Sequence, residues 1–146
     1  MSEYKAAFIL SGSEILFLLS AGPPKSPTVP AKQFLKELRT NCIDHQESAQ
    51  GLVIKRLAQV VDGMITLQPT IQTIACALNQ TEALTTINRN GITEYVVCER
   101  LVLHISPYTH IPESWKITPY PDEAILSAAI GPYETISRTK AGRKNG

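Results

Sequence analysis

The chain has 146 residues, a formal net charge of +1 and a charged fraction of 18%. This length suits one domain with a core of its own, and the charged fraction is low beside the about 25% of an average soluble domain. The small net charge argues against a protein dedicated to nucleic acid, which usually has a clear basic excess. The odd number of cysteines, three, argues against a secreted disulfide framework and favours reduced thiols in a cytoplasmic setting.

The N-terminal segment predicts a β-hairpin. Two apolar runs, Tyr4–Leu10 and Ile15–Ser20, flank four turn-type residues at 11–14, which is the pattern of two strands joined by a tight turn. The whole run 6–21 has 16 residues and contains Glu14. A membrane span needs about 20 apolar residues, so we expect no membrane segment, and the polar break also argues against a signal peptide.

Two helices are predicted in the next part of the chain. The prolines within 21–30 indicate an extended connection, after which Pro30 suits the first position of a helix that runs to Asn41. A second helix is predicted from about Ser48 to Val61, because its apolar residues follow the three-and-four spacing of a single stripe. Gly63 would then end this helix.

The stretch from Gly63 to Asn88 has 26 residues and a single charged one, Glu82. Within it, Met64–Leu67 predicts a short strand and Pro69 the start of a helix. A second helical piece is expected to begin at a capping box that includes Glu82 and to stop at the turn Asn90-Gly91. Surface helices normally carry paired charges, so this stretch is buried either in the fold or against a partner.

The last third of the chain predicts a long strand followed by irregular structure. Residues 92–105 are rich in β-branched side chains and favour a strand, with a helix as the alternative because periodicity is ambiguous in such runs. The Pro/Tyr-rich segment 107–133 has a helical pattern only at 122–130, and 138–146 is a basic tail. We therefore expect an α+β fold: a single compact domain over 1–137 with an N-terminal hairpin, three to four helices and one long strand.

One segment, QTIACALNQTEALTTINRNG at 72–91, resembles the helix-turn-helix family in part. Ala75 occupies the small-residue position of the first helix and Leu78 the packing position before the turn. Asn79 replaces the usual turn glycine, which is tolerable because Asn accepts positive φ, but Gln80 stands where the family has an apolar residue. The resemblance implies a small DNA-binding regulator, our alternative function. Its phosphate contacts would come from the basic residues Arg89, Arg138, Lys140, Arg143 and Lys144.

Cysteine and histidine spacing raises a second alternative, a Cys/His hydrolase or metalloprotein. Cys42 and His45 have the spacing of a ligand pair, and Cys98, His104 and His110 could supply further ligands. Zinc sites use four ligands, usually in close pairs, whereas this chain has one such pair, and free cysteines are commonly small core residues. Because nucleophile-elbow and phosphate-loop motifs are also missing from the sequence, we assign no catalytic residue, no metal ligand and no cofactor.

The main interpretation is a non-catalytic assembly subunit, which binds a protein partner or copies of itself. Neutral polar and apolar residues can be buried at an interface at lower desolvation cost than charged ones, and Tyr and Trp are enriched at interface hot spots. A viral or phage particle is one natural setting, so the expected location is the cytoplasm or a virion. The candidate interface residues, from the neutral stretch and the aromatic segment, are Ile71, Ile74, Leu78, Leu84, Ile87, Tyr108, Trp115, Tyr120 and Tyr133.

Overall fold

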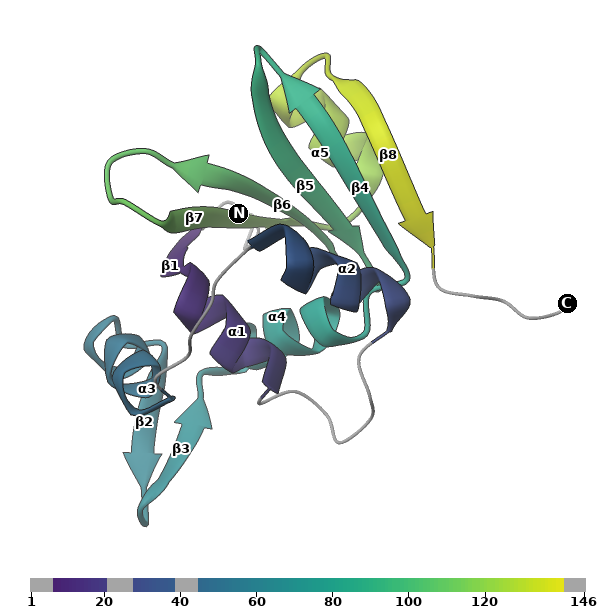
Figure 1. Ribbon diagram of the computed structural model, residues 1–146. Coiled ribbons are helices and arrows are strands. Elements are labelled where there is room, and N and C mark those ends of the chain that lie inside the picture. The colour runs from purple at the N-terminus through teal and green to yellow at the C-terminus, as the bar shows by residue number, and fades with distance from the viewer. Residues whose placement is uncertain (1–6, 21–27, 39–44, 141–146) are drawn as a thin grey trace, which may run out of the picture.

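The chain folds around a six-stranded antiparallel sheet of strand order β1-β7-β6-β5-β4-β8, with a separate two-stranded hairpin of β2 and β3 (Figure 1). The computed structural model describes residues 7–20, 28–38 and 45–140. The strands are β1 (Phe8–Ser11), β2 (Ala58–Val61), β3 (Met64–Leu67), β4 (Ala83–Arg89), β5 (Ile92–Cys98), β6 (Val102–Tyr108), β7 (Ser114–Tyr120) and β8 (Glu134–Lys140). The helices of the described segments are α1 (Gly12–Ser20), α2 (Val29–Leu38), α3 (His45–Ile54), α4 (Pro69–Asn79) and α5 (Glu123–Ile130).

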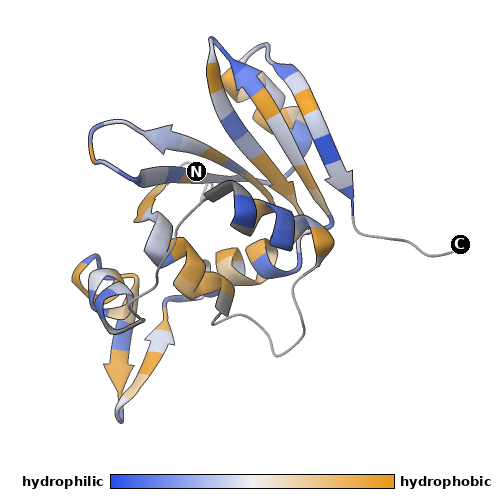
Figure 2. Cartoon of the chain, in the orientation of Figure 1, coloured by the Kyte–Doolittle hydropathy of each residue, from blue (hydrophilic) through white to orange (hydrophobic). Residues whose placement is uncertain are grey.

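The helices cover the sheet unequally, with α1, α2 and α4 on one face and α5 on the other (Figure 1). Because side chains alternate along a strand, the central strands supply residues to both layers. Leu84, Val97 and Leu103 lie beside one another in the main core, whereas Ile87 faces the other way and packs with Leu126 of α5. Figure 2 shows α1 coloured mostly hydrophobic, as expected for a helix enclosed by α3, α4 and the sheet.

The predicted N-terminal hairpin is wrong, because its second run forms α1 instead of a strand. The backbone N–H of Glu14 donates to Oγ of Ser11 at 3.1 Å, and the N–H of Ser11 donates to Oε1 of Glu14 at 3.0 Å. This reciprocal capping box satisfies two donors that a helix start would otherwise leave unpaired. The residues expected to turn a hairpin therefore begin a helix, and the first run pairs with β7 as β1.

The helix predicted over 48–61 is correct only in its first half. It ends at Ile54, Arg56 adopts a positive φ of 65°, and the chain then enters β2. Asp62 and Gly63 have φ values of 53° and 77°, the left-handed conformation that a two-residue hairpin turn requires. Gly63 therefore turns a hairpin and does not end a helix. The predicted short strand at β3 and the helix that begins at Pro69 are confirmed.

The helix-turn-helix interpretation is wrong, because the would-be recognition helix is β4. This segment pairs with β5 on one side and β8 on the other, and such tertiary pairing overrides a short helical pattern. Asn90 and Gly91 form a tight turn with φ values of 59° and 82°, but this turn joins two strands and does not end a helix. The strand expected over 92–105 is correct in type but not in length, since it divides into β5 and β6, which pair antiparallel.

The C-terminal part of the sheet ends in an irregular edge strand. The predicted helix at 122–130 is confirmed, with Asp122 as its N-cap accepting the backbone N–H of Ile125 at 2.9 Å. The prediction of a basic tail from 138 onward is wrong for 138–140, since Arg138 and Lys140 lie in β8. Between β4 and β8 the register shifts by one residue and leaves Ile136 without a partner across the strands, which is a β-bulge.

Candidate functional site

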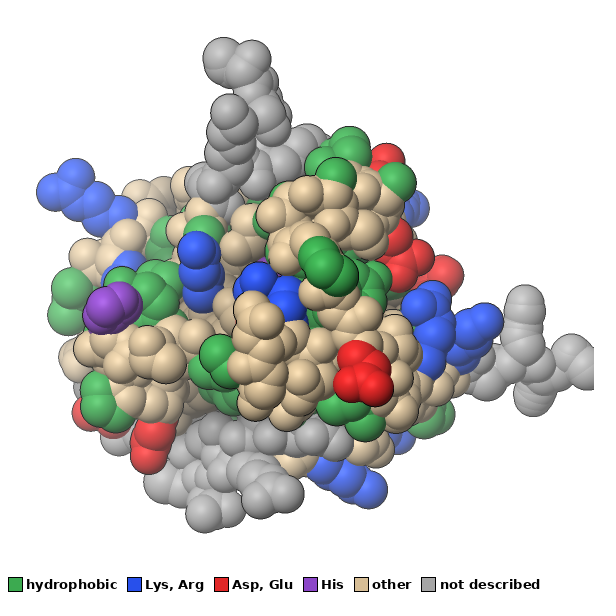
Figure 3. Space-filling view, turned by 90° about the horizontal axis from the view of Figure 1, so that it is seen from above, with side chains coloured by type: hydrophobic (Ala, Val, Ile, Leu, Met, Phe, Trp, Pro, Cys, Tyr) green, Lys and Arg blue, Asp and Glu red, His purple; other side chains and the backbone are tan. Residues whose placement is uncertain are grey.

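The largest concentration of exposed hydrophobic side chains lies on and beside the β2–β3 hairpin. Of the ten large hydrophobic residues exposed in the described segments, five fall between positions 54 and 65, with exposures from 37% to 80%. We call this set the hairpin surface; it consists of Ile54, Val60, Val61, Met64 and Ile65. Because side chains alternate along a strand, the pair Val60 and Ile65 lies on one face of the hairpin and the pair Val61 and Met64 on the other. The face of the molecule seen in Figure 3 differs, because charged side chains of both signs there separate small hydrophobic groups. Single exposed hydrophobic residues are ordinary, but a cluster of them indicates a binding surface.

The hairpin surface borders an apolar groove of about 670 Å³ between α1, α3 and the hairpin. Phe17 of α1 and Val53 of α3 form part of its wall, opposite Val60 and Ile65, which are cross-strand partners in the hairpin. The polar side chain in the lining is that of Gln50, and no lining residue is charged. This groove can therefore accept apolar groups without removing a charge from water.

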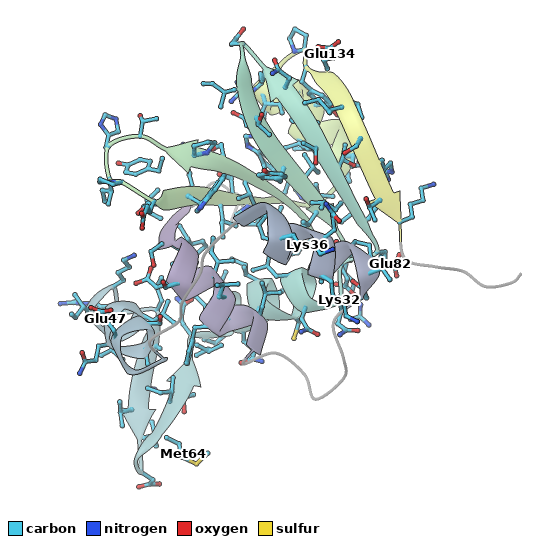
Figure 4. The ribbon with its side chains drawn as sticks, in the orientation of Figure 1. Lys32, Lys36, Glu47, Met64, Glu82 and Glu134 are labelled. Carbon is cyan, nitrogen blue, oxygen red and sulfur yellow. The ribbon has the colours of Figure 1, made fainter. Side chains whose placement is uncertain are left out.

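The hairpin is held at its base by backbone hydrogen bonds. The N–H of Leu57 donates to the carbonyl oxygen of Leu52 in α3 at 2.8 Å, and the N–H of Gln68 donates to the carbonyl oxygen of Leu57 at 2.9 Å. The tip extends away from the body of the molecule, and Met64 near that tip points outward (Figure 4). Among the described residues, neither edge of this two-stranded sheet pairs with a further strand.

The underlying α3 is fastened to α1 through a partly buried ion pair. Nζ of Lys55 lies 2.6 Å from Oε1 of Glu14 and also donates to the carbonyl oxygen of Ile9 at 2.9 Å. The Glu14 side chain is buried and lies directly against Gly51, where a larger residue would collide with it. Because its ammonium group is already paired, Lys55 adds little net charge to the hairpin surface. The charges left at the hairpin are Arg56 at its base and Asp62 at its tip, both exposed.

The interface residues expected from the neutral stretch lie in the core instead. Each is at most 1% exposed, so none of them can contact a partner. Four belong to the main core under α1, α2 and α4, and one belongs to the smaller core under α5. Burial in the fold therefore accounts for the missing charge over 71–88, where most residues are buried or half-buried, whereas 63–66 and 68–70 are exposed. These five residues are Ile71, Ile74, Leu78, Leu84 and Ile87.

The aromatic candidates are distributed over their own fold and do not form one surface. Trp115 packs on the main core with its ring centroid 5.8 Å from that of Tyr95. Tyr120 and Tyr133 pack against the smaller core beneath α5. Tyr108 is half-buried near the β6–β7 turn, and its ring centroid lies 5.2 Å from that of His110. These side chains mainly cover the sheet of their own molecule.

A buried array of ionisable groups joins β4, β5 and β6 on the α5 side. Glu94 accepts from Nε and Nη2 of Arg89 at 3.0 and 3.1 Å, and its Oε1 lies 2.7 Å from Nε2 of His104. Burial raises the pKa of Glu94, but hydrogen bonds from Arg89 and His104 outweigh it and hold that pKa below its ordinary value. Burial lowers the pKa of His104 despite the neighbouring carboxylate. Nη1 of Arg89 also donates to the carbonyl oxygen of Ile130 at 3.4 Å, so the array holds the C-terminus of α5.

The array has the character of a structural network. The side chains of Glu94 and His104 are only 4% and 6% exposed, which leaves little room for a substrate to reach them. A fully hydrogen-bonded buried group of this kind fixes the relative positions of the elements it joins. We therefore assign it to the docking of α5 on the sheet and not to catalysis.

Of the remaining basic candidates, those in the described residues do not gather into one basic patch. Nη1 of Arg138 donates to Oγ1 of Thr85 at 3.0 Å and lies 3.6 Å from Oε2 of Glu123. Lys140 is exposed at the end of β8, and Arg89 is held in the buried array. Arg143 and Lys144 lie outside the described residues.

The cysteine and histidine candidates within the described residues do not form one site. Burial raises the pKa of Cys98 to about 11, which keeps this thiol protonated and unreactive. His104 belongs to the buried array, whereas His110 is exposed in the β6–β7 turn. Cys42 lies outside the described residues, and His45 is the first residue of α3. In the described ranges, no three His, Cys, Asp or Glu residues are grouped as metal ligands.

Comparison with protein-family models, with curated proteins and with solved structures gives no match to this chain. None of the helices within 7–20, 28–38 and 45–140 is long and apolar enough to cross a membrane. The hairpin surface thus has to be interpreted from its own geometry and chemistry.

Proposed function

We propose that this protein is a non-catalytic assembly subunit that associates with copies of itself through the hairpin surface. The observation that carries the proposal is the cluster of exposed apolar side chains beside an apolar groove with no charged lining. Monomeric proteins rarely expose contiguous apolar patches of more than a few hundred Å² unless the patch binds something. A multi-copy particle, viral or phage particles included, is one setting in which such a subunit would serve.

Shape favours a second copy as the occupant of the groove. Ile54, Val60 and Ile65 border the hollow, whereas Val61 and Met64 lie near the projecting tip, on the opposite face of the hairpin. A two-fold symmetric interface requires a patch that is complementary to itself. A hairpin with apolar side chains on both faces can meet this requirement, since its tip supplies a projecting part and its hollow a receiving part.

The expected strength of association is moderate. Burying the exposed parts of these five side chains in both copies offers about 10 kcal/mol of transfer free energy, at about 2 kcal/mol for each fully buried side chain. Association itself costs roughly 4–15 kcal/mol in lost freedom of motion. We therefore expect a reversible, concentration-dependent oligomer and not a permanent one.

Light scattering over a concentration series, at two salt concentrations, tests the proposal. The wild-type chain should change from monomer to a discrete oligomer, and Met64→Lys should shift this transition to higher concentration because it places a charge in the apolar interface. Ile136→Lys is the matched control, since Ile136 is also a large exposed residue but lies on β8, far along the chain from the hairpin. A wild-type chain that stays monomeric throughout the series would overturn the proposal.

A further inference from the structure

We infer that two copies pair with their β2–β3 hairpins antiparallel about a two-fold axis, so that Asp62 of each copy lies beside Arg56 of the other. This inference rests on the proposed self-association and specifies its geometry. It follows from the position of charge along the hairpin and from the location of the groove.

The two charges stand at opposite ends of the hairpin. Arg56 precedes β2 at the base, and Asp62 occupies the turn at the tip. Both are exposed, and neither forms an ion pair with any residue of the described segments. Lys55, the neighbouring cation, is already bound to Glu14. The hairpin therefore presents one available positive charge and one available negative charge.

The sequence between these charges contains no other ionisable residue, since it consists of Leu57-Ala58-Gln59-Val60-Val61. At about 3.3 Å per residue, the base and tip are separated by roughly 20 Å. The returning strand, Met64–Leu67, is also uncharged. Each hairpin is thus uncharged and largely apolar along its strands, with a cation at its base and an anion at its tip.

Symmetry selects the orientation. In a two-fold interface each contact occurs twice: if one residue of the first copy contacts another residue of the second copy, the same two positions also meet with the copies exchanged. When the two hairpins are antiparallel, Arg56 of each copy lies beside Asp62 of the other, which gives one such pair at each end of the paired hairpins. Parallel hairpins would instead place Asp62 against Asp62 and Arg56 against Arg56, and such like-charge contacts oppose association.

The antiparallel arrangement also brings apolar surfaces together. The tip of each hairpin, with Val61 and Met64, then reaches the base of the other hairpin, where Ile54 borders the groove two residues before Arg56. The hairpin projects from the body of the molecule on the side away from β8 and α5 (Figure 1). Two hairpins can therefore overlap along their length while the six-stranded sheets stay apart.

Charge reversal with mixing tests this geometry. In a dimer of the Arg56→Asp variant, two acidic side chains would face each other at each end of the paired hairpins. In a dimer of the Asp62→Lys variant, two basic side chains would face each other there. Each variant alone should self-associate roughly tenfold more weakly than wild type, since two exposed pairs change from attraction to repulsion. An equimolar mixture should recover the wild-type affinity, because both pairs in the mixed dimer are again of opposite charge.

The measurement is sedimentation velocity of each variant and of the mixture, with one variant fluorescently labelled. Arg100→Asp is the matched control, because the Arg100 side chain is 93% exposed in the β5–β6 turn and should not affect association. Asp62→Asn separates charge from backbone effects, since Asn also accepts the positive φ of this turn.

Recovery of association in the mixture supports the antiparallel dimer. A wild-type oligomer that both charge reversals leave unchanged, or that mixing does not recover, overturns this geometry but leaves self-association standing. A wild-type chain that does not associate at all overturns the proposed function itself, so the two failures are distinguishable.

Discussion

The contact between α1 and α3 gives a sharp stability prediction at Gly51. A Cβ atom placed on this residue would lie inside van der Waals distance of Oε2 of Glu14. The Glu14 carboxylate is not free to move aside, because its Oε1 accepts from the N–H of Ser11 and pairs with Lys55. Gly51→Ala is therefore expected to break the capping box of α1 and the link between the two helices.

The expected magnitude comes from opposing terms. Alanine inside a helix is more favourable than glycine by about 1 kcal/mol. Against this, losing the capping interaction costs about 1 kcal/mol, and leaving partly buried donors unpaired costs about 1–3 kcal/mol, a cost reduced here because Lys55 is partly exposed. The net effect of Gly51→Ala should be destabilisation by about 1–2 kcal/mol. In a Glu14→Ala background the obstacle is gone, and the same substitution should stabilise by about 1 kcal/mol.

Urea unfolding of four proteins measures this reversal of sign: wild type, each single variant and the double variant. The difference between the two effects of Gly51→Ala is the coupling free energy between the positions. If Gly51→Ala stabilises the wild-type chain, or has the same effect in both backgrounds, then the Glu14 carboxylate does not hold the position described above.

Two further predictions concern the α5 side of the sheet. Leu126→Ala should destabilise by about 2–4 kcal/mol, because Leu126 is the fully buried anchor of α5; Ile125→Ala, at an exposed position of the same helix, should cost much less in the same urea assay. Stability should also fall as the pH is lowered from about 7 to 4, since His104 and Glu94 both have lowered pKa values in the fold. The unfolded chain then takes up protons before the folded chain does, at both groups. Urea midpoints that stay level across this range, or a His104→Gln variant with an unchanged slope between pH 7 and 5, would contradict the assignment.

Some local end signals could be interpreted correctly from the sequence, but Gly63 lies in a hairpin turn and Glu82 precedes a strand, so neither marks a helix end as expected. Pro69 begins a helix as predicted, and Asp122 caps the helix predicted at 122–130. Asn90-Gly91 forms a turn, although it joins two strands and does not end a helix. Each fixes φ or satisfies a backbone donor without help from the rest of the fold. The α+β character of the fold could therefore be inferred from sequence.

Apolar runs without clear periodicity were not predictable in the same way. Residues 15–20 are almost entirely apolar and 83–89 combine apolar with neutral polar residues, yet the first segment forms a helix and the second a strand. Because α1 and β4 are covered on nearly all sides, neither shows the alternation that separates the two structures. The capping residues Ser11 and Glu14 did carry the signal for the first case, in the Ser-x-x-Glu spacing.

The candidate site was missed for a related reason. Asp62-Gly63 between apolar residues is a strong hairpin signal, but the stripe that precedes it predicted a continuous helix. Whether a neutral apolar segment lies in the core or on the surface depends on which elements are packed over it. Ile71 and Val60 are chemically similar, yet the first is fully buried under the sheet and the second is 59% exposed.

The irregular β8 bears on whether the proposed association would stop at a finite size. A flat edge strand can recruit another molecule, and then a further one, into an endless fibre. Here the bulge at Ile136 interrupts the outer strand, and charged residues along it, including Glu134 and Lys140, oppose hydrogen-bonded pairing with a strand of another molecule. Association through the two hairpins would close on itself by symmetry, so this chain would form finite assemblies where a smooth sheet edge would permit open-ended polymerisation.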